Sequence, residues 1–215
     1  MPPSIHVIRH AQALHNVDQD FTIPDPELTE LGHEQCKKAT AELGDLGDKT
    51  VVILASPLQR TIQTALALFP AYTASGKKVV LVPDLQEIGV TPSDTGNSRE
   101  YLENKFGVIL DYDLLTPDWM DKSGASRNAP ECVEERARDT RVFIRSIAQK
   151  YGDENVNIVV VTHGQYLWSL TKNDIWFENV ERRTYVFASD AKESLEANFT
   201  ETPDSIARRS GSRPG

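Results

Sequence analysis

The chain has 215 residues, of which 39% are hydrophobic and 26% are charged, and this composition is typical of one globular domain with a sizeable core. Its formal net charge of -9 argues against nucleic acid or a membrane surface as the main partner, although a local cationic pocket can still bind a small anion. The two cysteines, Cys36 and Cys132, are too few for a disulfide framework and lack the spacing of a metal site, so we expect free thiols in a cytoplasmic protein.

The first predicted element is a buried strand within Ser4–His10, a short run rich in Ile and Val that ends in Arg9 and His10. Residues 11–28 are expected to form a loop because two prolines disfavour a helix there, and a helix is predicted to begin at Thr29. The further predicted strands cover 50–55, 79–82, 157–162 and 184–188, and the further predicted helices cover 57–69, 97–106, 130–151 and 165–172. Residues 84–96 and 107–129 are predicted to be irregular, and the second of these segments is a candidate lid.

Strands that alternate with helices predict a three-layer α/β/α fold with a mostly parallel central sheet. We expect a single domain over residues 1–189 and a polar, loosely ordered tail over 190–215. The N-terminus has no basic segment followed by an apolar run, and no stretch is long enough to span a bilayer. We therefore expect neither a signal peptide nor a membrane partner.

Cationic and titratable side chains follow three of the predicted strands. The first strand ends in Arg9 and His10, the second leads through Ser56-Pro57 to Arg60, and the most apolar strand is followed by His163. Because the carboxyl ends of parallel strands lie at one edge of a sheet, we expect these groups to converge. Arginine forks match phosphate oxygens, and helix N-termini add backbone donors, so the cluster is predicted to bind phosphate.

The same cluster suits covalent phosphoryl transfer. A neutral imidazole can attack phosphorus, and we assign this role to His10. The arginines and a protonated His163 would neutralise charge on the phosphoryl oxygens, while a carboxylic acid protonates the leaving oxygen. The loop after the third strand offers Asp84, Glu87 and Asp94. We choose Glu87 and expect partial burial to raise its pKa, with the nearby cations opposing that shift.

Five short motifs occur here in the order that they have in a known family. They are Arg9-His10-Ala11, Leu28-Thr-Glu-Leu-Gly32, Ser56-Pro-Leu-Gln-Arg-Thr-Ile-Gln-Thr64, Leu85-Gln86-Glu87 and Val161-Thr162-His163-Gly164. On these motifs the chain resembles the histidine phosphatase superfamily, in its phosphoglycerate-mutase-like branch, from about residue 4 to 170. The segment Asp94-Thr95-Gly96 is similar to a fungal-type subgroup of that branch.

The resemblance implies a catalytic domain that uses a phosphohistidine mechanism and needs no metal or other cofactor. It implies that His10 is the nucleophile, that Glu87 is the proton donor and that His163 is the second catalytic histidine. The phosphate-binding residues that it implies are Arg9, Arg60, Asn16 and His163. Asp94 is the alternative acid.

Two neighbours of His10 bear on this assignment. The glycine that the family has after the nucleophile is Ala11 here, and its methyl group would crowd the pocket floor if the position required unusual backbone angles. His15 lies close in sequence, and His10, His15 and His163 together would offer three imidazole ligands to a metal ion. We disfavour a metal site because two arginines are expected at the same place.

The segment before the long helix favours hydrolysis of a small phosphomonoester over a phosphoglycerate-type mutase reaction. The resemblance implies that such a mutase has a longer insertion with extra basic residues for a bisphosphate, whereas the basic residues here are few: Arg99, Lys105, Lys122 and Arg127. A catalytically silent module of the same fold that binds phosphorylated ligands is a further alternative. The motifs name neither the phosphomonoester nor the oligomeric state.

Overall fold

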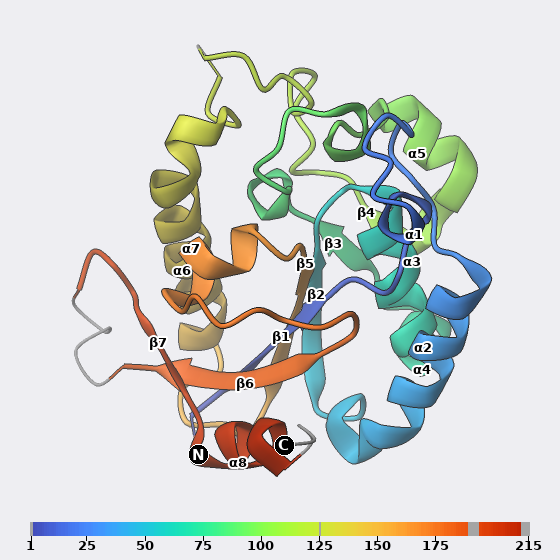
Figure 1. The fold of residues 1–215 in the computed structure, drawn as a ribbon. Coiled ribbons are helices and arrows are strands. Elements are labelled where there is room, and N and C mark those ends of the chain that lie inside the picture. The colour runs from blue at the N-terminus through green and yellow to red at the C-terminus, as the bar shows by residue number, and fades with distance from the viewer. Residues whose placement is uncertain (1, 125, 189–193, 212–215) are drawn as a thin grey trace.

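The apolar runs of the sequence form the centre of a seven-stranded sheet with the order β4-β3-β2-β5-β1-β6-β7 (Figure 1). The computed structural model describes residues 2–124, 126–188 and 194–211. The strands are β1 (Ser4–Arg9), β2 (Thr50–Ala55), β3 (Val79–Leu81), β4 (Leu110–Asp111), β5 (Asn157–Thr162), β6 (Arg182–Phe187) and β7 (Phe199–Glu201). The α-helices are α1 (Leu14–Val17), α2 (Glu30–Glu42), α3 (Gln59–Leu68), α4 (Pro70–Ala74), α5 (Arg99–Phe106), α6 (Val133–Gln149), α7 (Tyr166–Thr171) and α8 (Pro203–Gly211).

The first five strands form the parallel part of the sheet. β1 and β2 both pair parallel with β5, and β3 pairs parallel with β2 and β4. β6 is antiparallel to β1, and β7 is antiparallel to β6. The predicted α/β fold with a mostly parallel sheet is therefore confirmed. In the three described ranges, no helix is long and apolar enough to cross a bilayer.

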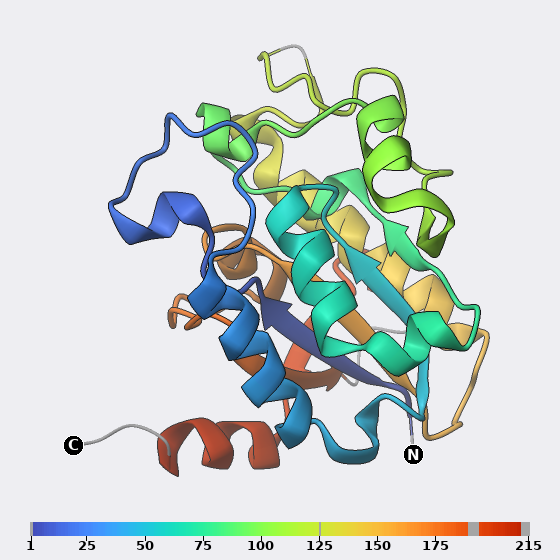
Figure 2. The same cartoon turned by 90° about the vertical axis from the view of Figure 1, so that its right-hand side faces the viewer.

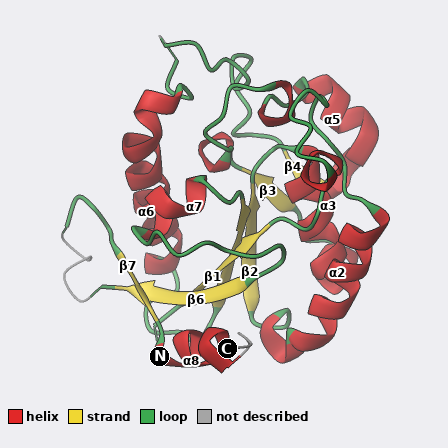
Figure 3. Ribbon diagram, viewed as in Figure 1, coloured by secondary structure: helices red, strands yellow, loops and turns green. Residues whose placement is uncertain are grey.

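Helices cover both faces of the sheet, which gives the three layers (Figures 2 and 3). Successive strand residues point to opposite faces, so β1 supplies both cores. Ile5 and Val7 pack in one core with Ile144 of α6. Ile8 packs in the other core with Ile62 of α3, and α2 covers the same face through Cys36. Burial on both faces explains why these strands are continuous apolar runs.

The C-terminal segment differs from the loosely ordered tail that we expected. β7 extends the sheet beyond β6, and α8 packs against β6. The hydroxyl of Ser205 accepts a hydrogen bond from the Thr184 N–H and donates one to Glu201. A strand of three residues is too short to show an alternation of apolar and polar residues. Only the polar composition was therefore visible in the sequence, and it suggested a tail. Residues 189–193 and 212–215 of the expected tail lie outside the described residues.

The boundaries of α3 also differ from the prediction. We expected Ser56 to cap this helix and Pro57 to open it, but the helix begins at Gln59 with Leu58 as its N-cap. The Ser56 hydroxyl is used elsewhere, as described below. Pro70 does not end the helical region; it opens α4, at the first turn where proline is favoured.

Candidate active site

The strand register brings the two predicted catalytic histidines together. Arg9 of β1 lies opposite Thr162 of β5, and the His10 N–H donates to the Thr162 carbonyl at 3.0 Å. His10 and His163 therefore leave neighbouring strands at the same level, with ring centroids 5.2 Å apart. On the other side of β5, Ser56 follows β2 at the same edge. The three strand ends meet as the sequence predicted.

His10 presents a neutral imidazole. Its Nδ1 lies 2.7 Å from the Ala11 carbonyl oxygen, and a carbonyl only accepts, so Nδ1 carries the hydrogen and Nε2 keeps the lone pair. Burial lowers the pKa of His10 well below its usual value, and the charges of Arg60 and Arg9 lower it further. The Nε2 atom is therefore available as a nucleophile without a base to deprotonate it.

His163 is also biased toward its neutral form, whereas we expected it to carry a proton beside phosphate. Burial first, and then the charge of Arg60, lower the pKa of His163 well below its usual value. Its Nε2 lies 2.8 Å from the Ser56 Oγ, and its Nδ1 is buried with no partner among the described residues. Full burial is a consequence of tertiary packing, so the sequence motif alone did not indicate it.

Arg9 packs against the ring of Trp176. Its Nη1 donates to the Phe177 carbonyl at 2.8 Å, and its guanidinium carbon lies 4.6 Å from the centre of the Trp176 ring. Gly164 lies next to both side chains, since a Cβ there would come within 2.8 Å of Trp176 and 3.2 Å of the Arg9 Nε. The glycine after His163 is therefore needed for this close approach.

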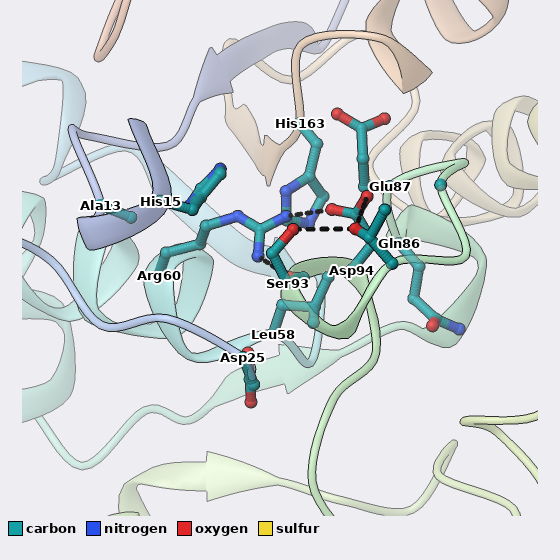
Figure 4. Close-up of polar contacts among 12 residues, drawn as sticks. Ala13, His15, Asp25, Leu58, Arg60, Gln86, Glu87, Ser93, Asp94 and His163 are labelled. Atoms are coloured by element: carbon teal, nitrogen blue, oxygen red, sulfur yellow. Dashed lines mark hydrogen bonds and ion pairs between the residues drawn. The ribbon is translucent and has the colours of Figure 1, made fainter. Parts of the chain in front are cut away.

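Arg60 enters the site from the first turn of α3 and contacts the loop that contains the alternative acid (Figure 4). Its Nη1 donates to the Ser93 carbonyl at 2.6 Å, and its Nη2 pairs with the Asp94 carboxylate at 3.0 Å. The other carboxylate oxygen of Asp94 accepts from Thr91 at 3.1 Å. A Cβ at Gly89 would lie 2.1 Å from that oxygen, so any larger residue there would displace the Asp94 carboxylate.

Glu87 is held close to the start of α7. Its carboxylate accepts from the backbone N–H groups of Ile88, Gln165 and Tyr166 at 3.0, 3.2 and 2.9 Å. These hydrogen bonds favour the ionised form, but burial and the charge of Asp94 outweigh them and raise the pKa of Glu87. The carboxyl group is thus biased toward its protonated form.

We call the segment around Glu87, residues 85–89, the acid loop. Two buried cations donate hydrogen bonds to its backbone carbonyls. The Lys122 Nζ donates to the carbonyls of Glu87 and Gly89, both at 2.8 Å. The Arg136 Nη1 donates to the Gln86 carbonyl at 3.1 Å. Lys122 is 9% exposed, and burial lowers its pKa to about 8. The sequence prediction missed Lys122 because a lone lysine in an irregular segment has no periodic signal.

Asn16 contacts its own neighbours instead of pointing freely into the site. Its Oδ1 accepts from the Ala13 N–H at 3.0 Å, at the start of α1. Its Nδ2 lies 3.0 Å from the Nε2 of His15. The predicted direct contact between Asn16 and phosphate stays a prediction, and the neighbouring His15 ring lies 5.9 Å from the His10 ring.

Ala11, the departure from the family pattern, causes no backbone strain. Its φ is not positive, so the position does not require glycine. Its N–H donates to the Thr64 Oγ1 at 3.0 Å, and its methyl group is buried in the core next to α3.

The arrangement combines a neutral imidazole with a free lone pair, two guanidinium groups and a buried carboxyl group with a raised pKa. Such a set can bind a phosphoryl dianion, transfer it to nitrogen and protonate a leaving oxygen. Within the described part of the chain, no group of three or more His, Cys, Asp or Glu side chains is placed to hold a metal ion.

Comparisons with known proteins agree with this fold. The chain is 25% identical to phosphoglycerate mutase-like protein 1 of Arabidopsis thaliana, over 95% of this chain and 88% of that protein. In structure it resembles an Entamoeba histolytica phosphoserine phosphatase (TM-score 0.56, 17% identity, 93% and 95% of the two chains). It also resembles a mycobacterial glucosyl-3-phosphoglycerate phosphatase (TM-score 0.57, 17% identity, 93% and 97% of the two chains). The family model for branch 1 of the histidine phosphatase superfamily matches residues 5–184, and the chain belongs to that superfamily.

Proposed function

We propose that the protein is a phosphatase that hydrolyses a small phosphomonoester through a phosphohistidine on the Nε2 of His10. One observation carries the proposal: the Nδ1–H of His10 is bonded to the Ala11 carbonyl, so a neutral ring offers Nε2 beside two arginines. Membership of the histidine phosphatase superfamily and the likeness in fold to two phosphatases support it.

In the first step the Nε2 lone pair of His10 attacks phosphorus, and the bond between phosphorus and the leaving oxygen breaks. Arg9 and Arg60 stabilise the charge on the phosphoryl oxygens. Protonated Glu87 donates its proton to the leaving oxygen, so the alcohol departs neutral and Glu87 becomes a carboxylate.

In the second step the Glu87 carboxylate takes a proton from water, and the water oxygen attacks the phosphorus of the phosphohistidine. The bond between phosphorus and Nε2 breaks, and inorganic phosphate leaves. His10 returns to its neutral form, and Glu87 is protonated again, so the cycle is closed.

Glu87 fits the acid better than Asp94. Burial raises the pKa of Glu87, which favours the protonated form that the acid needs. Asp94 pairs instead with Arg60 and accepts from Thr91, and these contacts give it the task of orienting the guanidinium.

Hydrolysis fits better than a mutase reaction because the basic residues between Glu87 and α6 already have protein partners. Lys122 donates to two carbonyls. The other pairs join Arg99 to Glu103, Lys105 to Glu27, and Arg127 to Asp84 and Asp139. A second phosphate group of the substrate could bind one of these cations only by breaking its present contacts.

Rapid-quench labelling with a panel of phosphomonoesters tests the proposal. We expect an acid-labile, alkali-stable phosphoryl group on the wild-type protein, release of inorganic phosphate, and no labelling of His10→Ala. Return of the phosphate to an isomer of the substrate would identify a mutase, and neither labelling nor turnover would identify a silent binding module. We also propose that no metal is required, so dialysis against a chelator should leave turnover unchanged.

A further inference from the structure

The mechanism above gives no task to His15, although this residue lies beside the nucleophile. His15 belongs to α1, is 5% exposed, and its ring lies 5.9 Å from His10 and 6.0 Å from Phe21. Buried polar side chains in native proteins nearly always have hydrogen-bond partners, so each nitrogen of this ring has to be accounted for.

The hydrogen bonds around Asn16 determine which nitrogen of His15 carries the hydrogen. The Ala13 N–H can only donate, so the atom of Asn16 that receives it is the carbonyl oxygen, and the amide group faces His15. An amide NH2 can only donate, so the His15 Nε2, 3.0 Å away, must accept. In a neutral imidazole the hydrogen then lies on Nδ1.

In the part of the chain that the structure describes, the Nδ1–H of His15 has no acceptor. Nδ1 is buried and unpartnered among the described residues. The charged groups that act on the ring are those of the candidate site, namely Arg60, Asp94 and Arg9. Burial, with the two arginines, lowers the pKa of His15 to about 4, which agrees with a neutral ring that keeps this single N–H. Figure 4 shows the ring on the Arg60 side of the cluster.

We propose that His15 is a phosphate-binding residue whose Nδ1–H donates to an oxygen of the phosphoryl group on its way to His10. This inference rests on the proposed phosphatase function. A phosphoryl oxygen is the acceptor that the site lacks without substrate, and the bond to a charged acceptor is stronger than a neutral one. Asn16 then acts through His15, because its amide fixes the tautomer in which Nδ1 is the donor.

The same tautomer argues against the alternative in which His15 joins His10 and His163 on a metal ion. A metal ligand must offer a lone pair, and the lone pair of His15 is engaged by Asn16. A purely structural task, in which the ring only packs against Phe21 and holds Asn16, is the alternative that an experiment must separate.

Two substitutions separate the two nitrogens of the ring. In His15→Asn the amide nitrogen can take the place of Nδ1 and keep the donor, while the acceptor for Asn16 is lost. In His15→Gln the amide lies near the place of Nε2, so an oxygen can still accept from Asn16, while the donor at Nδ1 is lost. Each variant thus retains one half of the contacts of His15.

The probes are inorganic phosphate and vanadate as competitive inhibitors, together with kcat and KM for p-nitrophenyl phosphate and the melting temperature. We expect His15→Gln to raise both inhibition constants on the order of tenfold or more, the cost of one hydrogen bond to a charged group. His15→Asn should stay within about threefold of wild type in both constants, even if its melting temperature falls.

The opposite pattern overturns the inference. If His15→Gln binds phosphate and vanadate as tightly as wild type, or if His15→Asn loses as much affinity as His15→Gln, then the ring is structural. A wild-type protein that forms no phosphoenzyme and binds neither anion would instead overturn the proposed function and the inference with it. A wild-type protein that turns over, with an unaffected His15→Gln variant, overturns the inference alone.

Discussion

The two sides of the candidate site are held in place differently. On the strand side, backbone hydrogen bonds of the parallel ladder place His10, Ser56 and His163 at one edge of the sheet. On the loop side, the acid loop has no such ladder, and buried cations bond to its carbonyls instead. The strand side should therefore tolerate changes in supporting side chains, whereas the loop side should depend on a few of them.

The largest expected effect comes from removing the proposed nucleophile on the strand side. His10→Ala should lower kcat by at least about 10⁴-fold, because no other described side chain offers a lone pair at the same place. Circular dichroism and the melting temperature should show that the fold survives.

His6→Asn is the matched control on the same strand. His6 bonds to Asn157 and Thr184, away from the site, so this variant should lower the melting temperature and leave kcat within a few-fold of wild type. Near-normal turnover of the His10→Ala variant would rule out a phosphohistidine on His10.

The next effect distinguishes the two carboxylates of the loop side. Glu87→Gln should slow hydrolysis of an alkyl phosphate by about 10²- to 10⁴-fold, and should matter less for p-nitrophenyl phosphate, whose leaving group needs little protonation. Asp94→Asn should mainly raise KM, because it loosens Arg60. If Asp94→Asn alone shows the dependence on the leaving group, the acid is Asp94.

The pH dependence of kcat is a second test of whether Glu87 is the general acid. Since burial raises the pKa of Glu87 and the acid must be protonated, kcat for an alkyl phosphate should fall as the pH rises through that pKa. His10 should add no acid limb near neutrality, because its pKa is lowered and the ring stays neutral. The descending limb should be absent in Glu87→Gln.

A smaller effect tests whether the acid loop depends on its buried cation. Lys122→Met keeps the apolar stem and removes the donors to Glu87 and Gly89, so kcat for an alkyl phosphate should fall about 10- to 100-fold. Arg127→Met is the control, because Arg127 is half exposed and its pairs with Asp84 and Asp139 should contribute little. Equal effects of the two substitutions would mean that the loop does not need the buried lysine.

The same contrast explains what the sequence predicted. Arg9, His10 and His163 were placed together correctly because an apolar run marks a buried strand and parallel strands share one edge. Their pKa values were harder to predict, since the lowered pKa of His163 follows from burial by residues distant in the chain.

The loop side and the sheet margins were less predictable. Lys122 and Arg136 act as single buried cations on carbonyl oxygens, and a single residue makes no pattern. Asp94 was considered only as an acid, because its pairing with Arg60 joins segments 34 residues apart. β4 and β7 have two and three residues, which is too short for an alternation to show.

The smallest expected effect returns to the strand side, at Ala11. Ala11 makes its contacts through its backbone: its carbonyl accepts from the His10 ring and its N–H donates to the Thr64 hydroxyl. Neither contact depends on the methyl group of Ala11. Ala11→Gly should therefore leave kcat and KM within about twofold. It should cost about 1 kcal/mol in the free energy of unfolding, since it loses a buried methyl group and gains backbone entropy in the unfolded chain. Urea unfolding and steady-state kinetics measure both quantities. A tenfold gain in activity would show instead that the methyl group obstructs phosphate, and that the ladder alone does not set the geometry of this side.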